Sequence, residues 1–154
     1  MLSKEKKIAR YKRLYKQLEP LIAGSPTFDA RLVTINAVLY HKMPHFFWVG
    51  FYFLSENKLI IGPYQGPLAC QELEYPKGVC WKSVLDNACI TVENVHEFPD
   101  HIACDSRSKS EIVIPIQNEN KEIIGVMDVD SDQLGAFDEA DEEGLKNIIL
   151  LLNR

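Results

Sequence analysis

Hydrophobic residues recur at three- and four-residue steps in three stretches of the chain, a period typical of helices that bury one face. The first stretch has its apolar positions at Ile8, Tyr11, Tyr15, Leu18 and Ile22. Pro20 should kink or end this helix, and residues 24–26 should break it, because proline and glycine oppose helical geometry. The pattern therefore predicts an N-terminal helix that stops by residue 24.

Two further helices follow the same period. The second begins after Thr27, a residue type that caps helix N-termini, and stops near residues 43–44. Its expected buried stripe consists of Phe28, Leu32, Ile35 and Leu39. The third helix spans residues 138–153, with an apolar side made of Leu145, Ile148, Ile149 and Leu152. A shorter helix is expected over residues 79–87.

Between the helices the pattern changes to short runs of β-branched and aromatic residues, which predict strands. The expected strands are two hairpins and one short strand, at residues 46–54 with 58–64, 111–117 with 122–130, and 90–92. Residues 65–78 and 93–109 have no regular period and are interpreted as irregular segments.

The order helix, helix, hairpin, small helix, hairpin, helix predicts an α+β fold in which helices pack against an antiparallel sheet. A length of 154 residues with 46% hydrophobic positions suits a single domain over residues 1–154. Within it, residues 1–26 form the N-terminal helix and its connector, and residues 27–154 form the core. Since no apolar run reaches the about 20 residues of a membrane span, we expect a cytoplasmic protein without a membrane partner.

Charge is distributed unevenly along the chain, which has a net charge of −5. Residues 1–24 hold seven Lys and Arg against two acids, and we interpret them as the solvated face of the first helix. Residues 93–143 hold fifteen of the 22 acidic residues and three basic ones. That acidic half argues against a nucleic-acid surface and suits a small cationic ligand better.

Four cysteines in a cytosolic chain are more often free, catalytic or metal-binding than structural disulfides. Cys104 lies in a polar loop where packing gives little reason for a thiol, whereas Cys89 reads as a small hydrophobic residue. The competing hypothesis is zinc, with candidate ligands Cys70, Cys80, Cys104, His96 and His101. Their spacing contains no Cys-x-x-Cys pair, so the preferred expectation has no metal. No glycine-rich loop follows a strand, which leaves a nucleotide cofactor without support.

A second candidate cluster is acidic. Asp128 and Asp130 are two residues apart on one expected strand and share a face, and Glu111 can approach them across the hairpin. One alternative is a solvent-facing polar side, but the surrounding residues are apolar on both faces, as in a covered strand. Crowded carboxylates raise one pKa, which would leave one acid able to donate a proton. Trp48 and Tyr52 also share a strand face and belong either to the core or to a pocket wall.

Six segments of the chain together resemble the GAF-domain free methionine-(R)-sulfoxide reductases. They are Trp48-Val49-Gly50-Phe51-Tyr52, Gly62-Pro63-Tyr64-Gln65-Gly66 with Ala69-Cys70, Gly78-Val79-Cys80, Asp100-His101-Ile102-Ala103-Cys104-Asp105, Ser108-Lys109-Ser110-Glu111-Ile112-Val113 and Gly125-Val126-Met127-Asp128-Val129-Asp130. The likeness runs from about residue 28 to the C-terminus. It implies a GAF-like antiparallel sheet with flanking helices.

The resemblance also implies roles for the matched residues. Cys104 would be the nucleophile that takes the sulfoxide oxygen as a sulfenic acid, Cys70 would resolve it as a disulfide, and Cys80 would be a third redox position. The substrate's ammonium and sulfoxide groups would be held by Glu111, Asp128 and Asp130, and its methyl-sulfur end by Trp48 and Tyr52. Members of this family are commonly homodimers that draw electrons from thioredoxin, and they need no metal or organic cofactor.

One stretch departs from the family pattern, since glycines are replaced by Pro76, which lies between Cys70 and Cys80, and by Trp81, which directly follows Cys80. The departure reduces the freedom of the backbone in this stretch, so either Cys70 or Cys80 can be the resolving cysteine. The rival function is a GAF sensor that binds a small ligand without catalysis. We expect such a sensor to be fused to an output domain, for which a chain of 154 residues has little room.

Overall fold

The computed structural model describes residues 1–153. Four helices and six strands form along the chain: α1 (Lys4–Ala23), α2 (Phe28–Lys42), β1 (Trp48–Ser55), β2 (Lys58–Gln65), β3 (Glu72–Glu74), α3 (Gly78–Asp86), β4 (Ile90–Val92), β5 (Ser110–Gln117), β6 (Ile123–Ser131) and α4 (Glu139–Leu150). Short 3₁₀ turns lie at Val95–Glu97 and Leu151–Asn153. None of the helices over residues 1–153 combines the length and the apolar character that crossing a lipid bilayer requires.

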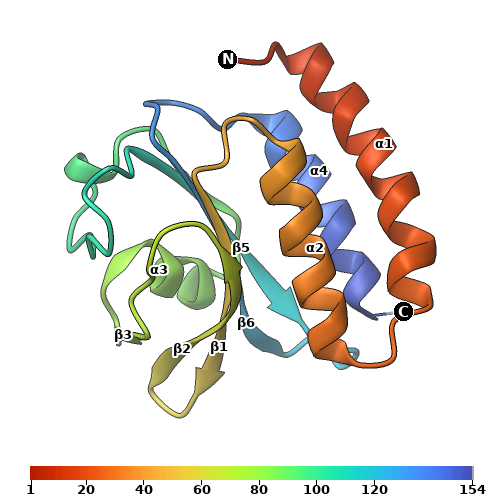
Figure 1. Ribbon diagram of the computed structural model, residues 1–154. Helices are drawn as coiled ribbons and strands as arrows, with labels where there is room; N and C mark the ends of the chain where they lie inside the picture. The colour runs from red at the N-terminus through yellow and green to blue at the C-terminus, as the bar shows by residue number, and fades with distance from the viewer. Residues whose placement is uncertain (154) are drawn as a thin grey trace.

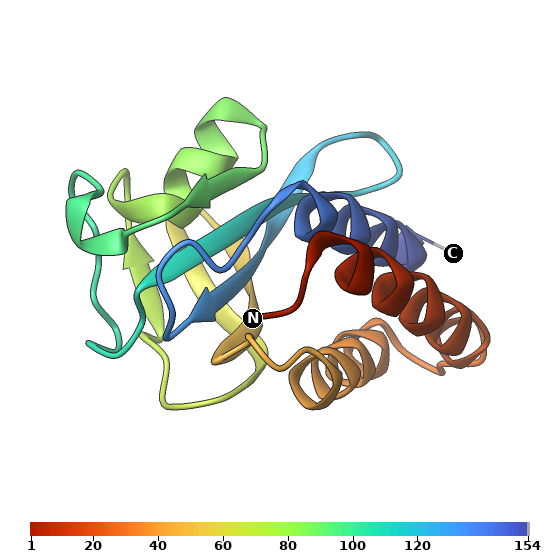
Figure 2. The same cartoon turned by 90° about the horizontal axis from the view of Figure 1, so that it is seen from above.

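All six strands belong to one antiparallel sheet in the order β3-β2-β1-β6-β5-β4. Helices α1, α2 and α4 gather on one side of this sheet, and α3 lies on the other side (Figures 1 and 2). The α+β class and the antiparallel sheet are therefore confirmed. Because consecutive residues of a strand point to opposite faces, each central strand contributes to two separate cores.

The two cores differ in character. Val49 and Phe51 of β1 and Met127 of β6 face the helical layer and are fully buried there. Trp48 and Tyr52 of β1 face the other side, where they join a smaller cluster with Cys80 of α3 and others. This smaller core shares its face of the sheet with the acids expected to form a site.

Some local expectations were confirmed only in part, and others were wrong. Helix α1 ends at Ala23, which confirms the predicted stop by residue 24. It does not end at Pro20, because Ile22 is 1% exposed and its burial outweighs one missing hydrogen bond near the helix end. Ile8 and Phe28 were expected in buried stripes, yet both are exposed. The irregular segment 65–78 contains the short strand β3, which pairs with β2 and owes its position to this tertiary contact.

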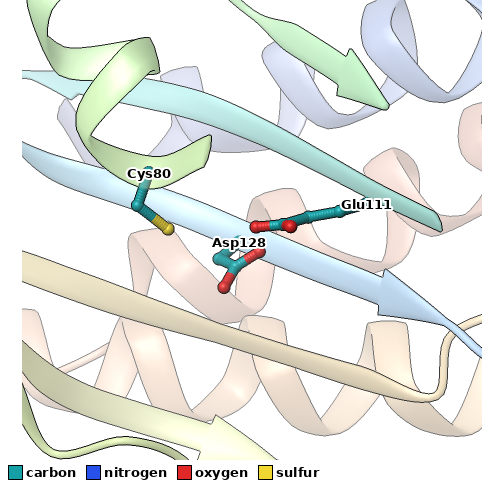
Figure 3. A group of neighbouring side chains, drawn as sticks. All are labelled: Cys80, Glu111 and Asp128. Atoms are coloured by element: carbon teal, nitrogen blue, oxygen red, sulfur yellow. The ribbon is translucent and has the colours of Figure 1, made fainter. Parts of the chain in front are cut away.

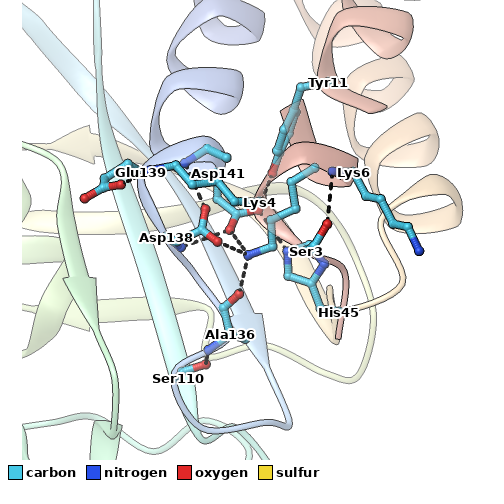
Figure 4. Close-up of polar contacts among 12 residues, drawn as sticks. Ser3, Lys4, Lys6, Tyr11, His45, Ser110, Ala136, Asp138, Glu139 and Asp141 are labelled. Carbon is cyan, nitrogen blue, oxygen red and sulfur yellow. Dashed lines mark hydrogen bonds and ion pairs between the residues drawn. The ribbon is translucent and has the colours of Figure 1, made fainter. Parts of the chain in front are cut away.

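The basic N-terminal segment is not wholly a solvated face, because Lys7 is 1% exposed. Its ammonium group makes ion pairs with Asp138 and Asp141 at the start of α4 (Figure 4). Asp141 also accepts a hydrogen bond of 2.9 Å from the Tyr11 hydroxyl and contacts His45 Nε2 at 2.9 Å. Burial of one cation among these partners joins α1 to α4, which the charge pattern of the sequence did not predict.

Candidate active site

The pairing of β5 with β6 brings the three acids together. Glu111 lies opposite Asp130 and Val113 lies opposite Asp128, so all three carboxylates emerge on the same face of the sheet. That face is covered by α3 and by the loop before β5. Glu111 is 6% and Asp128 7% exposed, and Asp130 is partly buried. The juxtaposition expected from the sequence is thus present, and the alternative of a solvent-facing polar side is wrong for Glu111 and Asp128.

Crowding and burial set the protonation of these acids. Burial and the charges of Asp128 and Asp130 raise the pKa of Glu111 well above its usual range. Burial together with the charges of Asp128 and Asp105 does the same to the pKa of Asp130. Burial raises the pKa of Asp128 only to about 6, because hydrogen bonds from Glu111 and Cys80 favour its charged form. Asp128 is therefore the acid of the cluster that ionises most readily, and Glu111 and Asp130 hold their protons more tightly.

The ionised carboxylate has spare hydrogen-bonding capacity. Asp128 Oδ1 is buried and has no hydrogen-bond partner among residues 1–153. Close to it lies the thiol of Cys80, which extends from α3 and is 4% exposed. Figure 3 shows Cys80, Glu111 and Asp128 pointing toward one another from α3, β5 and β6. A buried acceptor without a partner is expected to receive a donor from a ligand.

An aromatic wall stands beside the acids. The Trp48 ring stacks on Tyr52 and on Tyr64 of β2, with centroid distances of 6.1 and 5.4 Å. Gly50 makes this arrangement possible, because a Cβ there would come within 2.4 Å of the Trp48 ring. The wall fits the alternative in which Trp48 and Tyr52 line a pocket, although both are also nearly buried.

Both aromatic residues hold the loop that carries Cys70. Trp48 Nε1 donates to the Pro67 carbonyl at 3.1 Å, and the Tyr52 hydroxyl donates to the Cys70 carbonyl at 2.8 Å. Cys70 in turn forms a disulfide with Cys104, whose Cα atom is 5.3 Å away. The covalent bond joins two loops that are 34 residues apart in the sequence.

The other two cysteines are free thiols. Burial and the charges of Asp128 and Glu111 raise the pKa of Cys80 well above its usual range, which makes it a poor nucleophile. Cys89 is partly buried and packs against the helical core, as expected of a small hydrophobic residue. Two of the candidate zinc ligands considered from the sequence, Cys70 and Cys104, are bonded to each other and so are not available to bind a metal ion.

The loop before β5 adds Asp105 and Arg107, which the sequence reasoning did not select, and His101, which it considered only as a zinc ligand. His101 Nε2 lies 3.8 Å from Glu111 Oε2. Burial and the charge of His96 lower the pKa of His101. Arg107 binds Asp105 through two hydrogen bonds of 3.0 and 2.8 Å to its side chain. Membership of His101 and Asp105 in the segment around Cys104 was the signal that could have found them.

One pocket collects these groups. Seven of the eight residues selected from the sequence line it, namely Trp48, Tyr52, Cys80, Cys104, Glu111, Asp128 and Asp130. The eighth, Cys70, is bonded to the Cys104 sulfur. Phe47, Leu68 and Ile102 add apolar surface to the same pocket. A cavity with an aromatic wall, an ionisable carboxylate, two acids with raised pKa values and a disulfide can accept a small ligand with a cationic group, and the cysteine pair can exchange two electrons with it.

Comparison with known proteins gives a consistent picture, although no protein-family model matches the chain. The free methionine-R-sulfoxide reductase of Escherichia coli is 40% identical over 94% of this chain and 87% of its own length. The GAF domain-containing protein A of Dictyostelium discoideum is 44% identical over 99% of this chain and 96% of its own. The crystal structure of a Neisseria meningitidis free methionine-R-sulfoxide reductase with its substrate superimposes with a TM-score of 0.90, at 38% identity over 95% of this chain and 87% of that one.

Proposed function

The chain belongs to the GAF-domain free methionine-R-sulfoxide reductase family, and we propose that it reduces free L-methionine-(R)-S-oxide to methionine through Cys104 and Cys70. The observation that carries this proposal is the Cys70–Cys104 disulfide at a pocket with three carboxyl groups. A dithiol and a disulfide interconvert by two electrons, which is the number that reduction of a sulfoxide requires.

The pocket offers partners for the ammonium group and for the methyl-sulfur end of the substrate. The Asp128 carboxylate, with its unpartnered Oδ1, pairs with the ammonium group. Trp48 and Tyr52 frame the methyl-sulfur end, where their ring faces contact an apolar group. A residue within a peptide has no free ammonium group, so the same contacts favour the free amino acid.

Chemistry begins when the Cys104 thiolate attacks the sulfoxide sulfur while Glu111 or Asp130, protonated in the pocket, donates a proton to the oxygen. The oxygen, now carrying the donated proton, passes to the Cys104 sulfur as the substrate sulfur loses its bonds to oxygen and to Cys104. Methionine leaves, and Cys104 becomes a sulfenic acid. The Cys70 thiol then condenses with it, which forms the disulfide and releases water. An external dithiol reduces the disulfide and is itself oxidised to a disulfide.

Cys70 is the better resolving residue of the two candidates. Its Cα atom lies 5.3 Å from that of Cys104, within the range that a disulfide requires. Cys80 is a fully buried thiol with a raised pKa, a state that disfavours attack on the sulfenic acid. We assign Cys80 a secondary place in the redox cycle.

The proposal extends to the partners. A thioredoxin-type dithiol is the electron donor, and Cys104 is exposed in its loop, where such a partner can reach the disulfide. This chemistry depends on a reducing compartment and therefore on the cytoplasm. The working protein is a homodimer of single-domain chains, and in each chain residues 1–26 pack on the core that begins at residue 27.

Counting thiols distinguishes the reductase from a sensor. The reduced protein has four cysteines, and stoichiometric free R-sulfoxide should leave two thiols per chain. Cys89→Ser is the matched control and should also lose two, while the S-sulfoxide and the N-acetylated R-sulfoxide should consume almost none. A protein that binds the sulfoxide but keeps all four thiols would be a non-catalytic sensor.

A further inference from the structure

Cys80, Glu111 and Asp128 form a cluster that the proposed reaction uses only in part (Figure 3). One sulfur and carboxylate oxygens of these three residues all lie within 4.8 Å of one another. Each residue is at least nine-tenths buried, with exposed fractions of 4%, 6% and 7%. The reaction assigns the two acids to the substrate but gives the Cys80 thiol only a secondary place in the redox cycle.

The donor set has the composition of a zinc ligand set. Zinc binds thiolate sulfur at about 2.3 Å and carboxylate oxygen at about 2.0–2.2 Å, so ligands of one tetrahedral ion are about 3.5 Å apart. Side-chain rotations of about 1 Å would bring the present atoms to that separation. Magnesium and calcium prefer oxygen ligands alone, whereas the sulfur of Cys80 selects thiophilic ions.

A second observation points to a ligand at this position. Asp128 Oδ1 is buried, lacks a partner among the described residues, and belongs to a residue that lines the pocket. The pocket also opens to solvent, since exposed Leu68 and Cys104 are part of its wall. An ion can therefore enter, and a water molecule can fill the fourth coordination position as in open zinc sites.

We propose that Cys80, Glu111 and Asp128 bind a thiophilic divalent cation of the zinc class. Binding replaces the S–H bond of Cys80 by a sulfur–metal bond and the O–H bond of Glu111 by an oxygen–metal bond, and both protons are released to solvent. The bound ion occupies the place assigned to the substrate's ammonium group, so it excludes the substrate. That exclusion rests on the proposed function, whereas the binding itself does not.

Cobalt(II) tests the site, because a thiolate bound to cobalt gives a charge-transfer absorption band in the near ultraviolet. The protein is used without an affinity tag and with the Cys70–Cys104 disulfide formed, which removes both residues as ligands and avoids a chelating dithiol. Cys80 and Cys89 are then the remaining thiols. Titration should produce the band in the wild type and in Cys89→Ser, and zinc should abolish it by displacing cobalt.

Variants of the ligands complete the experiment. Cys80→Ser should show no band, and Asp128→Asn should bind cobalt at least about tenfold more weakly, since a charged ligand is lost. Asp132→Asn, which changes an exposed acid just beyond β6, should bind like the wild type.

Should Cys80→Ser fail to fold, as judged by circular dichroism, the contrast between the two aspartate variants decides the matter. A wild type without the band, a band that persists in Cys80→Ser, or equal binding by both aspartate variants would overturn the proposal. No substrate is present, so this outcome is independent of the thiol count that tests the reductase.

Discussion

Replacing Asp128 with asparagine removes one negative charge from the pocket without changing the size of the side chain. The residue is 7% exposed, so its charge is poorly screened by water. At about 4 Å and an effective dielectric constant of about 20, two unit charges attract by about 4 kcal/mol. The asparagine carbonyl still accepts a hydrogen bond, which returns about 1 kcal/mol. We therefore expect a net loss of about 2–3 kcal/mol of transition-state binding for the free sulfoxide.

That loss corresponds to a fall in kcat/KM of about 30- to 150-fold. The assay compares free methionine-(R)-sulfoxide with its N-acetylated form, at saturating dithiothreitol, in the wild type, Asp128→Asn and Asp132→Asn. Because the acetylated substrate has no ammonium group, its low kcat/KM should change less than about threefold. An equal fall for both substrates would refute the assignment of Asp128 to the ammonium group, and so would an unchanged kcat/KM.

The pH profile gives an independent readout of the same charge. In the wild type, kcat/KM should rise as the pH passes about 6, where Asp128 loses its proton and can pair with the ammonium group. It should fall again at higher pH, as Glu111 or Asp130 ionises through its raised pKa and no longer donates a proton. Asp128→Asn should lose the acidic limb and keep the alkaline one. If the acidic limb persists in Asp128→Asn, the ionisation near pH 6 belongs to a group other than Asp128.

Three further variants test the remaining assignments. Cys104→Ser should reduce turnover with dithiothreitol more than about a thousandfold, because a hydroxyl is a far weaker nucleophile than a thiolate. A rate near that of the wild type would refute the role of Cys104 as nucleophile. Cys70→Ser should keep its turnover with dithiothreitol, whereas its turnover with thioredoxin should fall to less than about a tenth of the wild-type rate, since no disulfide can form. An equal loss with both reductants would argue against Cys70 as the resolving cysteine. Lys7→Met should lower the free energy of unfolding in urea by about 3 kcal/mol, because Asp141 keeps a buried charge without its cation. Lys6→Met, at an exposed position, should unfold like the wild type, and equal values for both variants would contradict the buried ion pair.

Much of the local structure could be predicted from the sequence. The helix that begins after Thr27 ends at Lys42, close to the expected stop, because capping and proline act locally. The short strand Ile90–Val92 has the expected bounds, and the hairpin partners differ from expectation by one or two residues. Alternation along β6 was enough to place Asp128 and Asp130 on one face, since the period of a strand fixes which side chains share a side.

Contacts between distant segments decided the rest. Lys7 looks like a surface residue within its own helix, and only the packing of α1 against the start of α4 buries it beside Asp141. Strand β3 forms because it pairs with the free edge of β2, and the three residues of β3 do not by themselves predict this pairing. Such outcomes depend on which groups meet in space, and propensity within a short window carries no information about that.

The candidate site also depends partly on the sequence alone and partly on the tertiary structure. The sequence by itself supplied the residue types and, through the family resemblance, the cysteines and acids that matter. The tertiary structure decided that Cys70 and Cys104 approach closely enough to bond, while Cys80 instead points at Glu111 and Asp128. It also decided which carboxyl groups hold their protons more tightly, because their pKa values depend on burial and on neighbouring charges from other strands. Distance and dielectric environment are properties of the folded chain, and no single segment of the sequence contains them.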